Sequence, residues 1–294
     1  MRIRRVGICG SGIMGSGIMQ VAAVTGHDVV LRSRTTGAAQ ATLARLQQTL
    51  EKQVHKGRMT TVEREGALDR ITVTSDLDGL SDCDLVIESI LEDLPAKKGL
   101  FMDLEEACKP GAILATNTST LPVVELAMAT KRPGLVVGIH FFNPAPMMDL
   151  IEVVRPVTAS EDTVKAALQF AAACGKQPVE VKDQAGFVVN ALLFPYLNNA
   201  IKLADAQVAS VEGVDAAMKG GCGFPMGPFE LLDLVGLDTS LAILEALHDE
   251  FGEPHLAPAP RLRRMVAAGH LGRKTGQGFY TYPSAPGPSG SGLT

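Results

Sequence analysis

A glycine-rich turn near the start of the chain constrains the fold more than any other feature of this sequence. Residues 5–9 (RVGIC) are typical of a short buried strand, and an Ala-, Met- and Val-rich helical segment follows and ends near Gly26. Between them stands Gly10-Ser11-Gly12-Ile13-Met14-Gly15, a GxGxxG pattern. In this context the first glycine permits the tight turn, the second lets backbone N–H groups approach a pyrophosphate, and the third lets helix and strand pack closely. The pattern therefore predicts a dinucleotide-binding unit in which these six residues contact the cofactor.

The rest of the first half alternates strand-length apolar runs with helical patterns. Strand-like runs occur at residues 29–31, 71–73, 85–87, 112–115, 135–139 and 150–154, and helical segments occur at 38–56, 96–107 and 123–129. This alternation predicts an α/β fold with an open, mostly parallel Rossmann-type sheet and helices on both faces.

The pattern changes after about Asp183. From residue 186 to residue 247 the periodicity is helical throughout, interrupted by the glycine- and proline-rich stretch 220–228. We therefore predict an N-terminal Rossmann-type domain over residues 1–184, a C-terminal all-helical domain over 185–282 and a flexible tail over 283–294.

Composition excludes several classes of protein. The 294 residues correspond to about two domains at roughly 150 residues each. The net charge of -5 gives no basic excess, which argues against a nucleic-acid partner, and no run of ~18 apolar residues suggests a membrane span. The first apolar run is broken by glycines, too early for a signal peptide, and the five cysteines include no CxxC pair. We expect a cytoplasmic protein with reduced thiols and no metal site.

The end of the second strand departs from the usual NAD pattern. An acidic residue normally stands there to bind the ribose hydroxyls, but this chain has Arg32-Ser33-Arg34 and no carboxylate until Glu51. A small hydroxyl residue between two arginines suits a 2′-phosphate, whereas the alternative is that both arginines are merely solvated in a loop. We favour NADP over NAD, with Ser33 and Arg34 as the contacts.

Polar side chains at the ends of later strands suggest a chemical centre. His140 ends a probable core strand, and Glu152 is a carboxylate inside the next apolar run, where it needs a partner such as an imidazole. The run Thr116-Asn117-Thr118-Ser119-Thr120 follows another core strand, and Asn190 opens the first helix of the second domain. Each residue alone could be a turn, cap or structural residue. Together they indicate an interdomain site that binds an oxygen atom near a nicotinamide.

With these motifs the sequence resembles the short-chain L-3-hydroxyacyl-CoA dehydrogenases, in particular the bacterial 3-hydroxybutyryl-CoA dehydrogenases. The resemblance covers nearly the whole chain. Its distinctive pieces, in order, are GSGIMG at 10–15, NTST at 117–120, GIHFFNP at 138–144, GFVVN at 186–190, GPFELLD at 227–233, GLD at 236–238 and GRKTGQGFY at 272–280. Several specific motifs in the right order carry far more weight than any one of them.

The resemblance implies an NAD(P)-dependent enzyme that interconverts a short-chain 3-hydroxyacyl-CoA, such as (S)-3-hydroxybutyryl-CoA, and its 3-oxoacyl-CoA. It implies that His140 is the general base in alcohol oxidation and the acid in ketone reduction, and that Glu152 orients it. Ser119 and Asn190 are implied to hydrogen-bond the substrate oxygen. The family often has Arg after this asparagine, but the chain has Ala191, which puts an interdomain contact in doubt.

The resemblance also implies binding residues outside this centre. Glu92, Lys97, Asn117 and Asn143 match positions beside the cofactor. Thr49 and Lys56 fall where the long helix of the family meets coenzyme A, and at seven residues apart they share one helical face. The alternative for these two is an exposed helix surface. The helical domain is implied to bind substrate and to form a homodimer.

Two other functions stay open at this point. One is a dehydrogenase of a free 3-hydroxy acid, of the gulonate dehydrogenase type, because such relatives share part of the motif set. The other is a cofactor-binding structural protein without activity, against which the presence of Ser119, His140, Glu152 and Asn190 argues.

Overall fold

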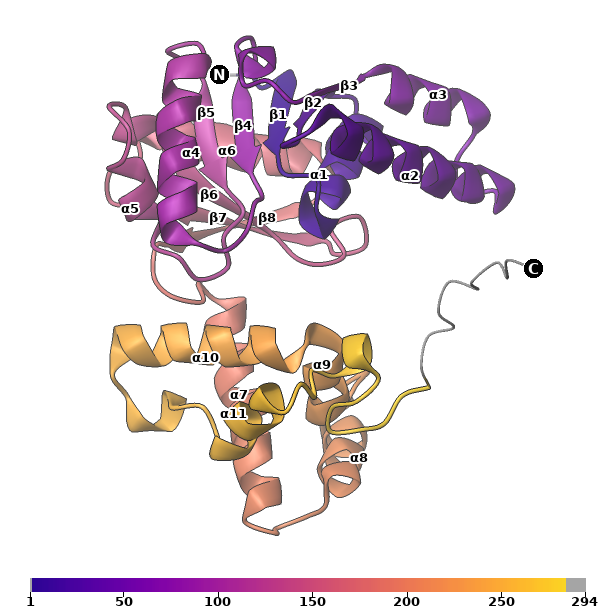
Figure 1. Cartoon of the computed structure of the whole chain (residues 1–294), viewed down its shortest axis with the longest axis vertical. Helices are drawn as coiled ribbons and strands as arrows, with labels where there is room; N and C mark the ends of the chain where they lie inside the picture. The colour runs from indigo at the N-terminus through magenta and orange to yellow at the C-terminus, as the bar shows by residue number, and fades with distance from the viewer. Residues whose placement is uncertain (1, 284–294) are drawn as a thin grey trace, which may run out of the picture. The chain divides into compact units, whose positions relative to one another are not determined.

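The first strand, β1 (Arg5–Cys9), lies inside a large twisted sheet (Figure 1). The computed structural model describes residues 2–283, and in that range the sheet has eight strands in the order β3-β2-β1-β4-β5-β6-β7-β8. The other strands are β2 (Asp28–Arg32), β3 (Ile71–Thr74), β4 (Leu85–Glu88), β5 (Ile113–Thr116), β6 (Val136–Phe141), β7 (Leu150–Arg155) and β8 (Gln177–Lys182).

The order of the first six strands, 3-2-1-4-5-6, is that of a doubly wound dinucleotide-binding sheet. These six strands pair in parallel, β7 runs antiparallel to β6, and β8 is parallel to β7. The mostly parallel α/β sheet expected from the sequence is therefore confirmed.

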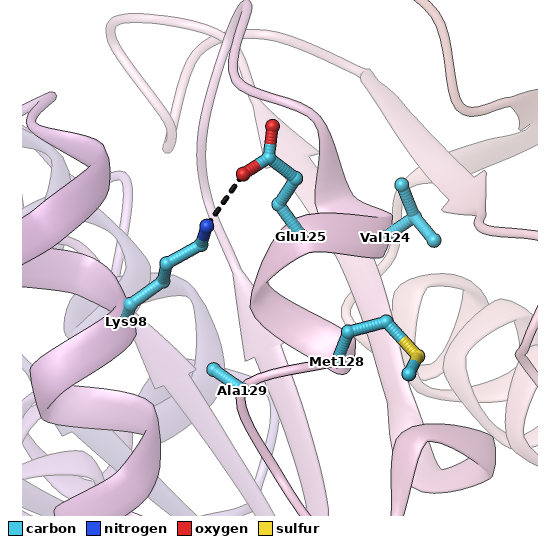
Figure 2. Close-up of a pocket in the computed structure, with 5 residues that line it drawn as sticks. All are labelled: Lys98, Val124, Glu125, Met128 and Ala129. Carbon is cyan, nitrogen blue, oxygen red and sulfur yellow. Dashed lines mark hydrogen bonds and ion pairs between the residues drawn. The ribbon is translucent and has the colours of Figure 1, made fainter.

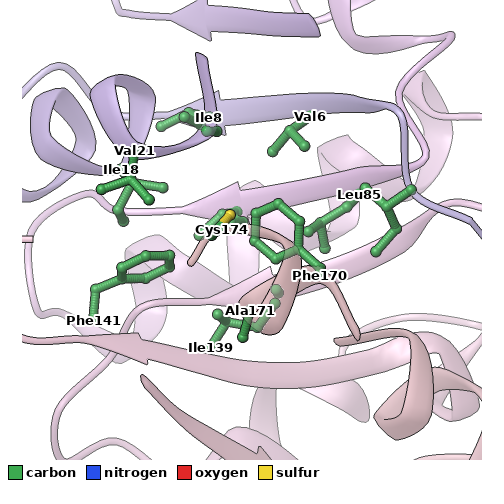
Figure 3. Close-up of a cluster of buried hydrophobic side chains, with 14 of the residues drawn as sticks. Val6, Ile8, Ile18, Val21, Leu85, Ile139, Phe141, Phe170, Ala171 and Cys174 are labelled. Carbon is green, nitrogen blue, oxygen red and sulfur yellow. The ribbon is translucent and has the colours of Figure 1, made fainter. Parts of the chain in front are cut away.

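Helices cover both faces of the sheet because successive strand residues point to opposite sides. In β4, Leu85 and Ile87 join one apolar cluster with α1 (Ile13–Val24) and α6 (Glu161–Ala173). Figure 3 shows part of this cluster, including Ile18 and Val21 from α1 and Phe170 from α6. The same face carries α2 (Thr36–His55) and α3 (Thr61–Asp69).

The opposite face is closed by a second cluster. Val86, between the two residues named above, packs with Phe101 of α4 (Leu94–Ala107) and Leu126 of α5 (Val123–Ala127). Both clusters consist of buried and mostly aliphatic or aromatic side chains, so the carboxyl ends of the parallel strands are held at one rigid edge.

The chain divides into two compact units, Met1–Phe187 and Val188–Thr294. The described part of the second unit contains the helices α7 (Val189–Asp205), α8 (Val211–Cys222), α9 (Pro228–Val235), α10 (Leu237–Phe251) and α11 (Pro260–Ala267). The break expected at Gly220 is wrong: α8 continues through Gly220 and Gly221 and ends where Gly223 adopts a left-handed φ of 69°. Of the tail predicted over 283–294, residues 284–294 lie outside the described residues.

Two buried carboxylates fasten the end of the described chain onto the helices of the second unit. Asp233 of α9 accepts hydrogen bonds from the backbone N–H groups of Phe279 and Tyr280, both at 2.9 Å, and from the Tyr282 hydroxyl at 3.0 Å. Asp215 of α8 accepts one from the Tyr280 hydroxyl at 2.8 Å. Both aspartates are almost fully buried, so this segment is held by side-chain acceptors rather than by a helix or sheet of its own.

No helix within residues 2–283 combines the length and the apolar content that crossing a bilayer would require.

Candidate active site

The glycine turn leaves the start of α1 open. Gly10 has a φ of +125°, and a Cβ at this position would lie 2.2 Å from the Ser89 carbonyl oxygen, so only glycine fits. A Cβ on Gly15 would lie 1.9 Å from the Gly10 carbonyl oxygen, so this position also accepts only glycine. Gly12, the N-cap of α1, is different, because a Cβ there meets nothing within 4 Å and no side chain caps the helix. Packing therefore explains Gly10 and Gly15, whereas Gly12 leaves uncapped backbone N–H groups accessible, as a pyrophosphate requires.

The residues at the end of β2 point in different directions. Ser33 is buried, and its hydroxyl lies 2.8 Å from the hydroxyl of Ser11 in the glycine turn. Arg32 donates from Nε to the Ser75 carbonyl oxygen at 3.1 Å, whereas Arg34 is exposed. The structure thus brings Ser33 to the glycine turn and leaves the Arg34 guanidinium on the surface beside it in sequence.

His140 and Glu152 lie opposite each other in the β6–β7 ladder. The imidazole Nδ1 is 2.8 Å from Glu152 Oε2, and the two side chains are 5% and 1% exposed. An ionised carboxylate can only accept, so the proton of the neutral ring lies on Nδ1 and Nε2 carries the lone pair. The pair therefore presents a proton acceptor on the other side of the ring.

Ser119 stands at that other side. Its hydroxyl lies 3.2 Å from His140 Nε2. Two aromatic rings flank the imidazole, Phe142 at 4.5 Å and Phe187 at 5.5 Å between ring centroids. Glu152, His140 and Ser119 thus form a hydrogen-bonded series with aromatic rings on either side of the imidazole, which is suited to moving a proton at the Nε2 end.

Glu92 and Lys97 are bound to each other at 3.1 Å between Glu92 Oε2 and the ammonium. The Lys97 side chain is 1% exposed and that of Glu92 is 40% exposed. Burial raises the pKa of Glu92, but the Lys97 ammonium and the hydrogen bonds from Thr118 and Ser119 outweigh this effect, and the pKa lies below its ordinary value. Glu92 is therefore an ionised group at the edge of the site.

The remaining candidates of the first unit lie in the loops after β5 and β6 and on or beside α2. Asn117 Oδ1 accepts a hydrogen bond from the Phe141 backbone N–H at 2.8 Å, which ties the loop after β5 to β6 beside His140. Asn143 is exposed and precedes Pro144 through a cis peptide bond. On α2, Thr49 is exposed and donates to the Arg45 carbonyl oxygen, and Lys56 is the exposed C-cap.

Asn190 belongs to the second unit, where it is the second residue of α7 and is buried. Within residues 2–283 no three His, Cys, Asp or Glu side chains converge to hold a metal ion.

The sequence analysis did not identify Phe142, Phe187 or Glu88. Glu88 ends the buried strand β4 and is fully buried itself. The sequence did contain an indication for Glu88, because a carboxylate at the end of an apolar run needs a partner just as Glu152 does. The two phenylalanines give no comparable signal, because aromatic residues are common in any core.

Comparisons with known proteins agree on one family. A family model described as "3-hydroxyacyl-CoA dehydrogenase, NAD binding domain" matches residues 5–184, and one described as "3-hydroxyacyl-CoA dehydrogenase, C-terminal domain" matches residues 186–282. The chain is 46% identical over 282 residues to a 3-hydroxybutyryl-CoA dehydrogenase of Mycobacterium tuberculosis, covering 95% of this chain and 99% of the relative.

More distant relatives and a solved structure give the same result. The human mitochondrial hydroxyacyl-coenzyme A dehydrogenase is 42% identical over 287 residues, covering 95% of this chain and 91% of the relative. The crystal structure of (S)-3-hydroxybutyryl-CoA dehydrogenase from Ralstonia eutropha superposes with a TM-score of 0.93 at 40% identity and covers 96% of this chain and 99% of that one. The chain therefore belongs to the 3-hydroxyacyl-CoA dehydrogenase family.

Proposed function

We propose that this protein is an NAD(P)-dependent 3-hydroxyacyl-CoA dehydrogenase that interconverts (S)-3-hydroxybutyryl-CoA and acetoacetyl-CoA in fatty-acid or butanoate metabolism. The observation that carries this proposal is the Ser119–His140–Glu152 arrangement at the edge of the sheet where the glycine turn also lies. The relatives named 3-hydroxybutyryl-CoA dehydrogenase support the choice of substrate.

A bound nicotinamide would supply the hydride chemistry at C3 of the substrate. His140 Nε2 accepts the proton of the C3 hydroxyl during oxidation and returns it during reduction. Glu152, 2.8 Å from Nδ1, holds the ring orientation and stabilises the imidazolium that forms. Ser119 donates a hydrogen bond to the C3 oxygen, and we assign the same role to Asn190. Phe142 and Phe187 exclude water from the ring.

We propose that the cofactor is held by residues 10–15 at the start of α1, together with Glu92, Asn117 and Asn143. Lys97, whose buried ammonium is bound by Glu88 and Glu92, supports this site through Glu92 rather than by its own contact. Ser33 and Arg34 favour NADP over NAD, because a buried hydroxyl next to an exposed guanidinium suits a 2′-phosphate better than a ribose hydroxyl. Thr49 and Lys56, both exposed on or beside α2, are the proposed contacts to coenzyme A.

We further propose that residues 1–184 bind the cofactor and residues 185–282 bind substrate and form a homodimer. Leu192 and Leu203 of α7 support the dimer, since they are 72% and 47% exposed and lie eleven residues apart, on one side of the helix. A cytoplasmic location fits the five unpaired cysteines.

The test is the loss of reduced-nicotinamide absorbance when acetoacetyl-CoA is added to purified protein, with NADPH and NADH in parallel. Saturable turnover of acetoacetyl-CoA, and none of free acetoacetate, is the expected result. Turnover of free acetoacetate at a similar rate would instead favour a dehydrogenase of free 3-hydroxy acids. Binding of NADPH or NADH without turnover of either substrate would contradict the proposal.

A further inference from the structure

We propose that Glu88 is a positioning residue for this reaction, which fixes Ser119 opposite His140 through a closed ring of hydrogen bonds. The inference rests on the proposed function for the roles of Ser119 and His140. It adds Glu88, which has no proposed contact with the substrate and is not among the catalytic or binding residues named above. Glu88 is the last residue of β4 and pairs in register with Cys9 of β1 and Thr116 of β5. It thus lies beside the point where the strand order of the sheet reverses.

Glu88 is fully buried and fully hydrogen-bonded. Its two oxygens accept from the Lys97 ammonium at 2.7 and 2.9 Å, one accepts from the Ile90 backbone N–H at 2.6 Å, and the other accepts from the Thr116 hydroxyl at 2.7 Å. A charge without solvent contact is tolerable only with such a complete set of partners. The carboxylate is therefore an anchor with little freedom to move.

One route from this anchor runs through the ammonium of Lys97. Its third bond goes to Glu92 Oε2 at 3.1 Å, so all three donors of the ammonium are occupied. The other oxygen of Glu92 accepts from the Ser119 backbone N–H at 2.9 Å and from the Thr118 hydroxyl. Lys97 thus transmits the position of Glu88 to the backbone of Ser119.

A second route runs through Thr116. Its hydroxyl donates to Glu88 Oε2 and accepts from the Thr118 backbone N–H at 3.2 Å. Both routes meet at Thr118, which closes the ring Glu88–Lys97–Glu92–Thr118–Thr116. Ser119 follows directly, and its hydroxyl lies 3.2 Å from His140 Nε2. The backbone N–H groups of Thr118 and Ser119 are both held by members of the ring, so the Ser119 hydroxyl has little freedom to move. Misplacement of a reacting group by about 1 Å can cost on the order of 100-fold in rate.

The variant Glu88→Gln tests the inference, because glutamine keeps the size of the side chain and removes the charge that holds Lys97. We expect kcat for acetoacetyl-CoA to fall about 10- to 100-fold, while KM and the Kd for NADPH or NADH change less than about threefold. Independently of turnover, amide hydrogen exchange at Thr118 and Ser119 should become at least about tenfold faster.

The matched control is an exposed carboxylate–ammonium pair on neighbouring helices. Lys98 of α4 binds Glu125 of α5, as Figure 2 shows, and these side chains line a surface hollow of about 300 Å³ that no member of the ring lines. Glu125→Gln removes a carboxylate from a lysine in the same way, and it should leave kcat and the exchange of Thr118 and Ser119 unchanged. If Glu88→Gln behaves like this control, the inference is wrong.

A second variant separates positioning from stability. Glu88→Gln leaves Lys97 with one carboxylate in a buried place, which lowers the melting temperature or prevents folding. Glu88→Gln/Lys97→Met removes both fully buried charges and leaves only the partly exposed carboxylate of Glu92, so the melting temperature should recover toward the wild-type value, while kcat stays low and exchange at Ser119 stays fast. Because Glu92 lacks the ammonium in this double variant, the pKa of its carboxyl group should rise. Any loss of stability caused by protonation of Glu92 should therefore begin at a higher pH than in the wild type.

Recovery of kcat and of amide protection together with the melting temperature would show that Glu88 is merely structural and would overturn the inference. A wild-type protein that does not turn over acetoacetyl-CoA would contradict the proposed function, whereas the exchange measurement would still decide whether Glu88 fixes Ser119.

Discussion

Glu152 is the ladder neighbour of His140 across β6 and β7, and its carboxylate lies 2.8 Å from the imidazole Nδ1. This is the antiparallel pair in a described sheet whose other pairs are parallel. Opposed residues of antiparallel strands hold their side chains on the same face. The direction of β7 thus gives the imidazole a buried acceptor that no loop has to supply.

Glu152→Gln should change both the height and the shape of the pH profile of kcat. The amide keeps the size and the hydrogen bond, but it removes the negative charge that stabilises a protonated imidazole. The measurement is kcat across the pH range in which the wild type is folded. A profile that is lower but unchanged in shape would mean that Glu152 only supports the structure.

His140→Ala should reduce kcat by ~10²–10⁴-fold, the range for loss of a general acid or base. Cofactor binding should persist, because the glycine turn and α1 are not altered, and the Kd for NADPH or NADH checks this point. The control is His55→Ala, a histidine that is 75% exposed at the end of α2. Near-normal turnover of His140→Ala would remove His140 from the mechanism.

Ser33→Asp should shift cofactor preference from NADP toward NAD. A carboxylate at the end of β2 accepts hydrogen bonds from ribose hydroxyls and repels a 2′-phosphate. The ratio of kcat/KM for NADPH to that for NADH is the quantity to compare. Thr36→Asp, at the exposed start of α2, adds the same charge nearby and should move this ratio less. A ratio that does not move in Ser33→Asp would show that this residue does not select the cofactor.

The lowered pKa of Glu92 predicts a contribution to stability that is lost in acid. A carboxyl group whose pKa is lower in the folded state stabilises that state above its unfolded pKa, and the contribution disappears as pH falls through the folded pKa. Wild type should therefore exceed Glu92→Gln in melting temperature at neutral pH, and the difference should shrink below the ordinary value of 4.5. Because the Glu92 side chain is 40% exposed, solvent screens its charge and the difference in melting temperature should be modest. A difference that stays constant down to the acid transition would contradict this assignment.

Asp233→Ala should lower the free energy of unfolding by about 3 kcal/mol, because it removes a buried carboxylate and leaves two part-buried N–H groups and a hydroxyl without their acceptor. Chemical denaturation followed by circular dichroism measures the change. Asp249→Ala is the control, since this side chain is 84% exposed on α10 and its loss should cost little. Equal stability of the two variants would mean that the C-terminal segment is not held through Asp233.

Much of the fold could be predicted from local pattern, and the failures have local reasons. Buried parallel strands produce continuous apolar runs, so β1 to β7 all stood out. In contrast β8 (QPVEVK) is mostly exposed at the sheet edge and lacks such a run. The short helix α3 was also missed, although Thr60 and Glu63 form a capping box at its start.

The site was predictable where residues lie at strand ends, because strand order places those ends together. This explains why His140, Glu152 and Ser119, from three separate segments, are found in contact. Side-chain direction was not predictable, since it depends on packing partners far away in sequence: Ser33 turns to Ser11, whereas Arg32 turns away to Ser75. The ion pair between Lys97 and Glu88 could not be predicted for the same reason.

The attachment of the C-terminal segment to Asp233 has a consequence for how the chain is made. This carboxylate and its partners are separated by 46 to 49 residues, and the partners belong to the final part of the described chain. While the ribosome is still adding those residues, Asp233 has been synthesised but its hydrogen-bond donors have not, so the helical unit cannot reach its final packing. The sheet unit ends at Phe187 and needs none of them. The first unit can therefore be complete before the second unit reaches its final packing, because the second unit requires Tyr282, the last of the three partners of Asp233, to be synthesised.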